Sequence, residues 1–172
     1  MATLHTAIRA AVYGITFILL WGWLALSVRR YDTNIPLSFP SWTPVVGLVL
    51  MVSGGMLVLV CVAMFVAKGH GTQAPFDPPK EFVVVGPYKY VRNPIYLGGS
   101  SLLLGFGLMH RSVSMILFCL FASGLTHLFV VFVEEKGLER RFGSPYRQYK
   151  QSVNRWLPEI ADTSRHVGIT QQ

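Results

Sequence analysis

SVSMILFCLFASGLTHLFVVFVEE, residues 112–135, is a long apolar run that ends in two adjacent glutamates. A helix needs about 20 apolar residues to cross a hydrocarbon core roughly 30 Å thick. The run from Ser112 to Val133 meets that length. We therefore predict a transmembrane helix, with Glu134 and Glu135 at the point where it leaves the membrane.

Three further apolar runs precede this one, at about Ala10 to Val28, Pro44 to Ala67 and Ile95 to Met109. The first two are long enough to span a bilayer. The third is shorter, and only Arg111 and its neighbours separate it from the fourth, so we expect a tight helical hairpin. The first run is too long for the apolar part of a signal peptide, and we expect it to remain as a spanning helix.

The composition agrees with a membrane protein. Of the 172 residues, 52% are hydrophobic and 13% are charged, whereas a soluble domain carries about a quarter charged residues. We predict an all-α integral membrane protein of about four transmembrane helices with a cytoplasmic, amphipathic C-terminal helical segment. Residues 1–172 would form a single membrane domain, with two N-terminal transmembrane helices in 1–67 and a C-terminal core in 68–160.

The basic residues predict the orientation. The net charge is +7, but the basic residues lie between the apolar runs, which is typical of loops at an anionic membrane surface and not of a nucleic-acid groove. With the N-terminus inside, twelve of the fifteen fall on the cytoplasmic side, where they are favoured. Both termini would then be cytoplasmic, and the short loops suit a bacterial inner membrane. The twelve are Arg9, Lys68, Lys80, Lys89, Arg92, Lys136, Arg140, Arg141, Arg147, Lys150, Arg155 and Arg165.

The cytoplasmic loop before the third run is dense in glycine, proline, aromatic and charged residues. Asn93 and Pro94 suit the N-cap and first turn of the third helix. A capped helix start leaves Arg92 and Tyr96 unexplained, together with the glycine at position 98. A helix N-terminus also favours a carboxylate.

The chain after the fourth run reads as two short helices. EEKGLERRF would continue the fourth helix, and Gly143, Ser144 and Pro145 suit a helix end followed by a new start. Apolar residues then recur at helical spacing. The tail would either dock on lipid headgroups or cover a cytoplasmic pocket with its aromatic and basic set, namely Tyr146, Arg147, Tyr149, Arg155 and Trp156.

Two other features carry less weight. His127 lies inside the fourth run, but a lone histidine equally serves as a hydrogen-bonding group between helices, and we leave it out of the site. Cys61 and Cys119 lie in apolar runs and are expected to be small buried residues. Nothing in the sequence calls for a metal.

Two stretches, VVVGPYKYVRNPIYLGG (83–99) and VFVEEKGLERRFGSPYRQYKQSVNRWLP (131–158), resemble the isoprenylcysteine carboxyl methyltransferase and phospholipid methyltransferase group. The likeness covers about Phe76 to Pro158. Its parts occur in order: glycine-proline-tyrosine, Arg-x-Pro-x-Tyr, a helical hairpin, a Glu-Glu pair, Phe-Gly-x-x-Tyr-x-x-Tyr and a late Leu-Pro. The ordered set is specific, although each part alone is weak.

The resemblance implies S-adenosylmethionine as cofactor, bound at the cytoplasmic face, and a lipophilic acceptor that enters from the bilayer. It implies that Arg92, Asn93, Tyr96 and Glu135 line the cofactor site, with Gly98 nearby. Two positions depart from the prenylcysteine enzymes: Asn93 stands where they have histidine, and Ser152 or Arg155 stands near their late arginine. Both departures concern the acceptor more than the cofactor.

The residue types suit that cofactor. Its carboxylate would pair with Arg92, its ammonium with Glu134 or Glu135, and its sulfonium with the ring of Tyr88 or Tyr96. The predicted catalytic set is Arg92, Glu135 and Arg155. The cofactor-binding set is Tyr88, Arg92, Asn93, Tyr96, Gly98, Glu134 and Glu135.

Three functions stay open. The acceptor is a prenylcysteine-like carboxylate or another small lipid, or else a phospholipid amine or a thiol. The alternative from another class is a non-enzymatic membrane scaffold or lipid-binding protein. The expected partners are membrane lipids and a lipophilic small molecule, with no nucleic acid. Because the ionisable residues cluster at one membrane face, a site at that face is favoured over a transport pathway.

Overall fold

The computed structural model describes residues 2–34, 38–69 and 84–158. Most of the cytoplasmic loop, and with it Lys80, lies outside the described residues, as does Arg165. The helices are α1 (Ala2–Val28), α2 (Thr43–Met64), α3 (Pro94–Met109), α4 (Val113–Phe129), α5 (Glu135–Phe142) and α6 (Ser144–Ser152). Short 3₁₀ segments are η1 (Arg29–Asn34) and η3 (Gly86–Lys89), and π-helical segments are η2 (Phe65–Gly69) and η4 (Val130–Glu134).

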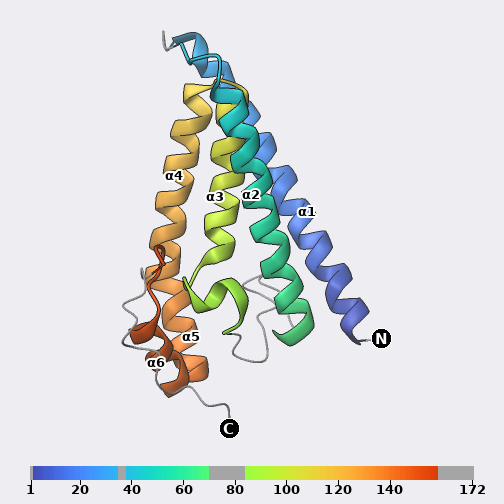
Figure 1. Ribbon diagram of the computed structural model, residues 1–172, viewed down its shortest axis with the longest axis vertical. Coiled ribbons are helices and arrows are strands. Elements are labelled where there is room, and N and C mark those ends of the chain that lie inside the picture. Colours follow the sequence, from blue (N-terminus) through green and yellow to red (C-terminus); the bar gives the residue numbers. More distant parts are fainter. Residues whose placement is uncertain (1, 35–37, 70–83, 159–172) are drawn as a thin grey trace.

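The long helices run side by side as a membrane bundle (Figure 1). Three stretches are long and apolar enough to span a bilayer, namely Ala7–Thr33, Thr43–Ala67 and Val113–Phe142, and α3 is a shorter apolar helix beside them. The described parts contain no strand. The prediction of an all-α integral membrane protein is confirmed. The start of α1 and the helices α5 and α6 lie at one end of the bundle, and the α3–α4 turn lies at the other.

The hairpin of α3 and α4 is as tight as predicted, since only residues 110–112 separate the two helices. Arg111 adopts a left-handed backbone conformation with φ of 51°. Ser112 caps α4, and its hydroxyl accepts a hydrogen bond from the Met115 amide at 3.1 Å. This cap stabilises the N-terminus of α4 because it satisfies one of the amides that a helix start leaves unpaired.

Glycines bring α2 and α3 into backbone contact. A Cβ built on Gly54 would lie 2.6 Å from the carbonyl oxygen of Gly98, and one built on Gly47 would lie 2.6 Å from that of Gly105. Lipid supplies little hydrophobic drive for helix association, so close packing of small residues does much of the work in membranes. These four glycines fix how α2 and α3 cross, and α3 in turn positions the residues at its N-terminus.

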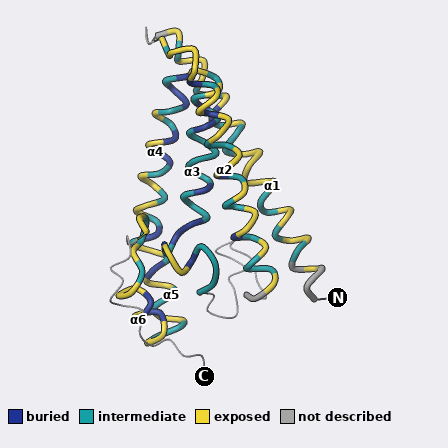
Figure 2. Tube along the Cα trace, viewed as in Figure 1, coloured by how far each residue is buried: buried dark blue, intermediate teal, exposed yellow. Residues whose placement is uncertain are grey.

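Small side chains fill much of the interior together with Met115 and Val130, and many large apolar side chains face outward. The buried apolar residues of the spanning helices include Ala25, Cys61, Cys119 and Ala122, so both cysteines are buried as expected. Figure 2 shows the buried positions on the sides of the helices that face one another. The exposed apolar side chains form the surface that lipid would cover, among them Phe17, Leu19, Leu48, Leu59, Leu120 and Phe121.

The C-terminal segment turns back on the bundle. Gly143 ends α5 with φ of 61°, a conformation that glycine adopts without strain. Ser144 is the first residue of α6 and Gly143 occupies the cap position, one residue earlier than the sequence suggested. Tyr146 and Tyr149 of α6 are buried. The tail therefore packs against protein, through contacts that the next subsection describes.

Candidate functional site

Three segments meet at the end of the bundle where α5 and α6 lie. The first is the start of α3 with the residues before it, from η3 to Tyr96. The second is the junction of η4 and α5, which carries Glu134 and Glu135. The third is the extended stretch after α6, from Val153 to Trp156. They come from distant parts of the sequence, so only folding brings their polar side chains together.

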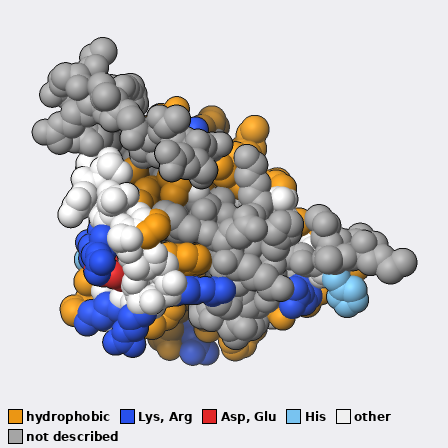
Figure 3. All heavy atoms as spheres, turned by 90° about the horizontal axis from the view of Figure 1, so that it is seen from below, with side chains coloured by type: hydrophobic (Ala, Val, Ile, Leu, Met, Phe, Trp, Pro, Cys, Tyr) orange, Lys and Arg blue, Asp and Glu red, His pale blue; other side chains and the backbone are white. Residues whose placement is uncertain are grey.

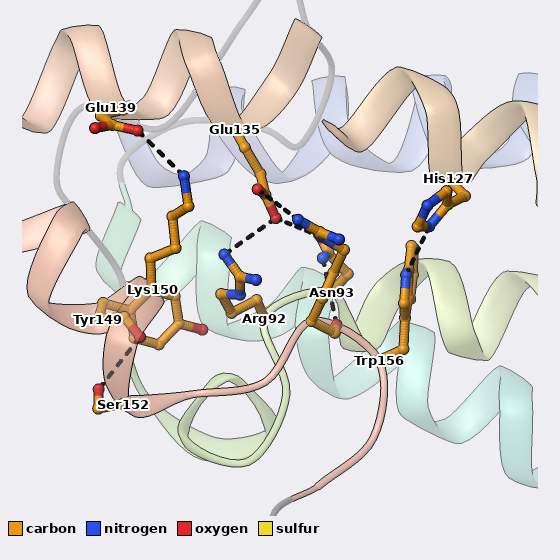
Figure 4. A network of polar contacts seen from close by, with 10 residues as sticks. Arg92, Asn93, His127, Glu135, Glu139, Tyr149, Lys150, Ser152 and Trp156 are labelled. Carbon is orange, nitrogen blue, oxygen red and sulfur yellow. Dashed lines mark hydrogen bonds and ion pairs between the residues drawn. The ribbon is translucent and has the colours of Figure 1, made fainter. Parts of the chain in front are cut away.

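Glu135 is the centre of this cluster (Figure 4). Arg155 binds it with two hydrogen bonds, Nε to Oε1 at 2.7 Å and Nη2 to Oε2 at 3.0 Å. Arg92 forms an ion pair with it from the other side, with Nη1 3.1 Å from Oε1. The Glu135 side chain is 6% exposed and that of Arg92 is 9% exposed. Both oxygens of this buried carboxylate are thus already engaged by guanidinium groups.

The residues beside Arg92 attach the tail through their backbone and side chains. The Arg92 amide donates to the carbonyl of Asn154 at 2.9 Å. Asn93 occupies the N-cap position of α3, as predicted, but its side chain does not cap the helix. Its Nδ2 donates instead to the carbonyl of Arg155 at 3.4 Å. Asn93 therefore positions the stretch that carries Arg155.

Glu134 has a separate partner. The phenol of Tyr96 donates a hydrogen bond to Oε2 of Glu134 at 2.7 Å. Glu134 is the last residue of the π-helical segment η4, and such segments often occur at functional sites because they change the register of a helix. Here the two neighbouring carboxylates both reach the start of α3, one at Tyr96 and the other at Arg92.

Three buried tyrosines, Tyr88 of η3 and Tyr146 and Tyr149 of α6, lie where the tail meets the bundle. The Tyr149 hydroxyl donates to the carbonyl of Tyr88 at 2.6 Å, and the Tyr88 ring packs edge-on against Phe65 at 5.2 Å. Burial raises the pKa of Tyr88 and of Tyr149. Burial, and then the charge of Glu135, raise the pKa of Tyr146 to about 12. All three are therefore neutral hydrogen-bonding groups at physiological pH.

The tail ends against α4. The Trp156 indole donates from Nε1 to Nδ1 of His127 at 2.9 Å, and the two rings lie 5.9 Å apart. The neighbouring Arg155 has its pKa raised by its hydrogen bond to Glu135. The sequence left His127 out of the predicted site, because a lone histidine in a span equally serves as a hydrogen-bonding group between helices. It does form a contact, with the tail.

The structure brings most of the predicted residues together. Arg92, Asn93 and Glu135 share one network with Arg155, and Tyr96 joins Glu134 beside it. Tyr88 lies under α6. Gly98 is different, because it faces the backbone of α2 and its lack of a side chain serves helix packing.

The two tail residues that the sequence left open lie in different surroundings. Arg155 enters the cluster, whereas the exposed Ser152 donates only to the carbonyl of Tyr149 at 3.2 Å. Sequence reasoning missed the backbone of Asn154 and the partner of Trp156. An indole N–H that lies near a membrane boundary usually finds an acceptor, which is a signal that Trp156 has a partner, but only the structure identifies it as His127.

The fold of the described residues is similar to that of a solved integral membrane protein. A solved structure described as the eukaryotic intramembrane Ras methyltransferase ICMT, an isoprenylcysteine carboxyl methyltransferase, superimposes with a TM-score of 0.61 at 19% sequence identity. The match covers 84% of this chain and 53% of that one, so this chain spans about half the length of that protein. At this identity the likeness establishes a shared fold.

The sequence comparison gives the family. The profile of the phospholipid methyltransferase family matches residues 42–145, which is more than half of the chain. The chain belongs to the phospholipid methyltransferase family. A comparison with curated proteins gives no significant match. The matched region includes Arg92, Tyr96, Glu134 and Glu135, whereas Arg155 lies beyond it.

Proposed function

We propose that the protein transfers a methyl group from S-adenosylmethionine to a lipophilic acceptor at the cytoplasmic membrane face. The observation that supports this most directly is the state of Arg92. Its Nε is buried without a hydrogen-bond partner among the described residues, whereas its Nη1 lies 3.1 Å from Oε1 of Glu135 and a side-chain hydrogen bond links the guanidinium to Tyr146. Buried charged donors normally have hydrogen-bond partners, so an anionic ligand group is expected beside them.

The cluster suits the three charged groups of this cofactor. A cofactor carboxylate would satisfy the unpaired Nε–H donor of Arg92. A cofactor ammonium requires an available anion, and Glu135 is already engaged by two guanidinium groups. Glu134 has one carboxylate oxygen bonded to Tyr96 and the other without a hydrogen-bond partner in the described part of the chain. We therefore assign the ammonium to Glu134 and a positioning role to Glu135.

The chain's own residues would act by positioning. When bound, S-adenosylmethionine supplies a methyl group on a positively charged sulfur, which leaves as a neutral thioether when an acceptor lone pair takes the methyl carbon. Arg92 and Glu134 would fix the two ends of the amino-acid part. The Tyr96 ring would face the positive charge, which stabilises it by roughly 0.5–2 kcal/mol. The docked tail would exclude water, and holding both reactants in line supplies much of the rate enhancement.

The acceptor is proposed to be lipophilic because the cluster lies at the end of a bundle whose sides expose large apolar side chains. A prenylcysteine-like carboxylate or another small lipid remains the first proposal, with a phospholipid amine or a thiol as the alternative. Asn93 supports an acceptor other than prenylcysteine, because its side chain is already used to hold the tail. We further propose that residues 68–160 form the cofactor-binding core. We also propose a bacterial inner membrane, with the end carrying α5 and α6 on the cytoplasmic side, since most basic residues lie at that end.

Calorimetry on the detergent-purified chain tests the proposal. We expect saturable one-to-one binding of S-adenosylmethionine or S-adenosylhomocysteine. Glu134→Gln should weaken binding of both. Glu139→Gln is the matched control, because Glu139 is a carboxylate in the following helix α5 that pairs with Lys150 at 3.3 Å.

Activity is then measured with methyl-labelled cofactor and extracted membrane lipids. Label that moves into the lipid fraction identifies the acceptor class. A folded wild-type protein that binds neither ligand would refute the cofactor assignment, and the scaffold or lipid-binding alternative would replace it. Equal binding by the Glu134→Gln and Glu139→Gln variants would refute the role given to Glu134.

A further inference from the structure

A second polar site lies on the outer side of α5 and α6. An open hollow there is lined by Lys136, Glu139 and Arg140 of α5 and by Arg147 of α6. Lys136 and Arg140 are four residues apart, which places them on the same helix face. Figure 3 looks onto this end of the molecule and shows Lys and Arg side chains gathered at one edge of the face.

The hollow has an excess of positive charge. Within the described residues, none of its three cations forms an ion pair with a carboxylate, and the one carboxylate in the lining, Glu139, is bonded to Lys150 at 3.3 Å. Three like charges around one hollow repel one another, and Glu139, which already pairs with Lys150, offsets them only in part. Two of them are arginines, whose planar groups match the oxygens of a phosphate.

The position along the fourth span indicates where that anion comes from. Phe132 and Val133 are 59% and 56% exposed on the apolar part of the span, just before the hollow begins. The ammonium of Lys136 lies 5.6 Å from the centre of the Phe132 ring. The lipid-facing surface thus changes from apolar to cationic within one helical turn, as expected at the level of the headgroups.

We propose that Lys136, Arg140 and Arg147 form a binding site for the phosphate of an anionic phospholipid. The acyl chains of that lipid would lie along Phe132 and the apolar surface before it. The bound phosphate would join α5 to α6 and so help to hold the tail on the bundle. The proposal does not depend on methyl transfer, because none of these side chains contacts the cluster around Glu135.

Binding of short-chain phosphatidylglycerol to the detergent-purified full chain, measured by native mass spectrometry, tests this proposal. We expect one tightly bound molecule. Arg140→Ala combined with Arg147→Ala should weaken it roughly 30-fold, because each cation near an anionic headgroup contributes about a factor of five. Arg141→Ala is the matched control, since Arg141 is an exposed arginine of the same helix that lies outside the hollow. Lys136→Ala alone gives a milder second variant.

The competing outcomes are distinct. Displacement of the lipid by millimolar inorganic phosphate would show a site for soluble phosphate. If Arg141→Ala weakened lipid binding as much as the double variant, the attraction would be diffuse and without a site. If phosphatidylcholine bound as tightly as phosphatidylglycerol, the protein would not distinguish lipids by their net charge. Each of these results overturns the proposal. Binding of S-adenosylhomocysteine is measured on the same variants and should be unchanged, so that loss of lipid binding is separated from failure of the methyl-transfer site.

Discussion

Replacing Glu135 with glutamine removes one negative charge from the site and leaves the shape of the side chain nearly unchanged. Glu135 holds Arg92 on one side and Arg155 on the other. Arg92 lies in the bend just before α3, and Arg155 belongs to the tail. The substitution therefore tests whether this carboxylate keeps the tail docked on the bundle.

The magnitude follows from burial. Glu135 and Arg92 are 6% and 9% exposed, and removing one partner of a buried ion pair costs about 3–5 kcal/mol because the other charge stays buried without compensation. The pair between Glu139 and Lys150 is far more exposed, at 34% and 40%, and such surface pairs contribute about 0–1 kcal/mol. Glu135→Gln should thus destabilise the docked tail much more than Glu139→Gln does.

Hydrogen–deuterium exchange of the peptide containing residues 146–156 measures this directly. About 3 kcal/mol corresponds to local opening that is more than 100-fold more frequent, so exchange in Glu135→Gln should accelerate by about that factor. Exchange in Glu139→Gln should stay within about fivefold of wild type. Tail exchange in Glu135→Gln that remains within twofold of wild type would refute the view that Glu135 holds the tail.

Three further changes have defined outcomes. Gly98→Ala should destabilise the protein by about 1–3 kcal/mol through overpacking, because its Cβ would lie 2.8 Å from the backbone of α2. The thermal midpoint of the detergent-solubilised protein should fall accordingly. Gly99→Ala should leave the midpoint unchanged, because a Cβ there meets nothing within 4 Å. Tyr149→Phe removes the 2.6 Å hydrogen bond to the carbonyl of Tyr88. It should destabilise tail docking by about 0.5–1.5 kcal/mol in the same exchange assay, which is the usual net contribution of one such bond. The pKa of Tyr146 is raised to about 12 from an ordinary 10, so its stabilising contribution is complete below pH 10 and is lost as the pH rises toward 12. Tyr146→Phe should therefore reduce the loss of thermal stability between pH 10 and pH 12. An unchanged loss in the variant would contradict this role.

The sequence by itself determined the membrane fold. Span length and apolar content are properties of continuous segments, so the long apolar runs and the α3–α4 hairpin could be predicted from residue order. Local backbone chemistry likewise marked the start of α3 at Asn93 and Pro94 and the end of α5 at Gly143. Each of these features depends on neighbours a few residues away. Residue order also showed that charged and aromatic groups gather beside two span ends, whereas the resemblance to the methyltransferase group implied which of them line a cofactor site.

Only the tertiary structure decided how those groups pair. The hydrogen bonds from Asn93 to Arg155 and from Arg155 to Glu135 join residues 62 and 20 positions apart. No local pattern encodes such pairs, because they arise when helix packing fixes the start of α3 beside the end of the fourth span. Packing also places Gly98 against the backbone of α2 and brings Arg155, but not Ser152, into the cluster. Guanidinium groups contact both carboxylate oxygens of Glu135, whereas one oxygen of Glu134 has no hydrogen-bond partner among the described residues. Which carboxylate can accept a ligand is thus set by the distances between helices.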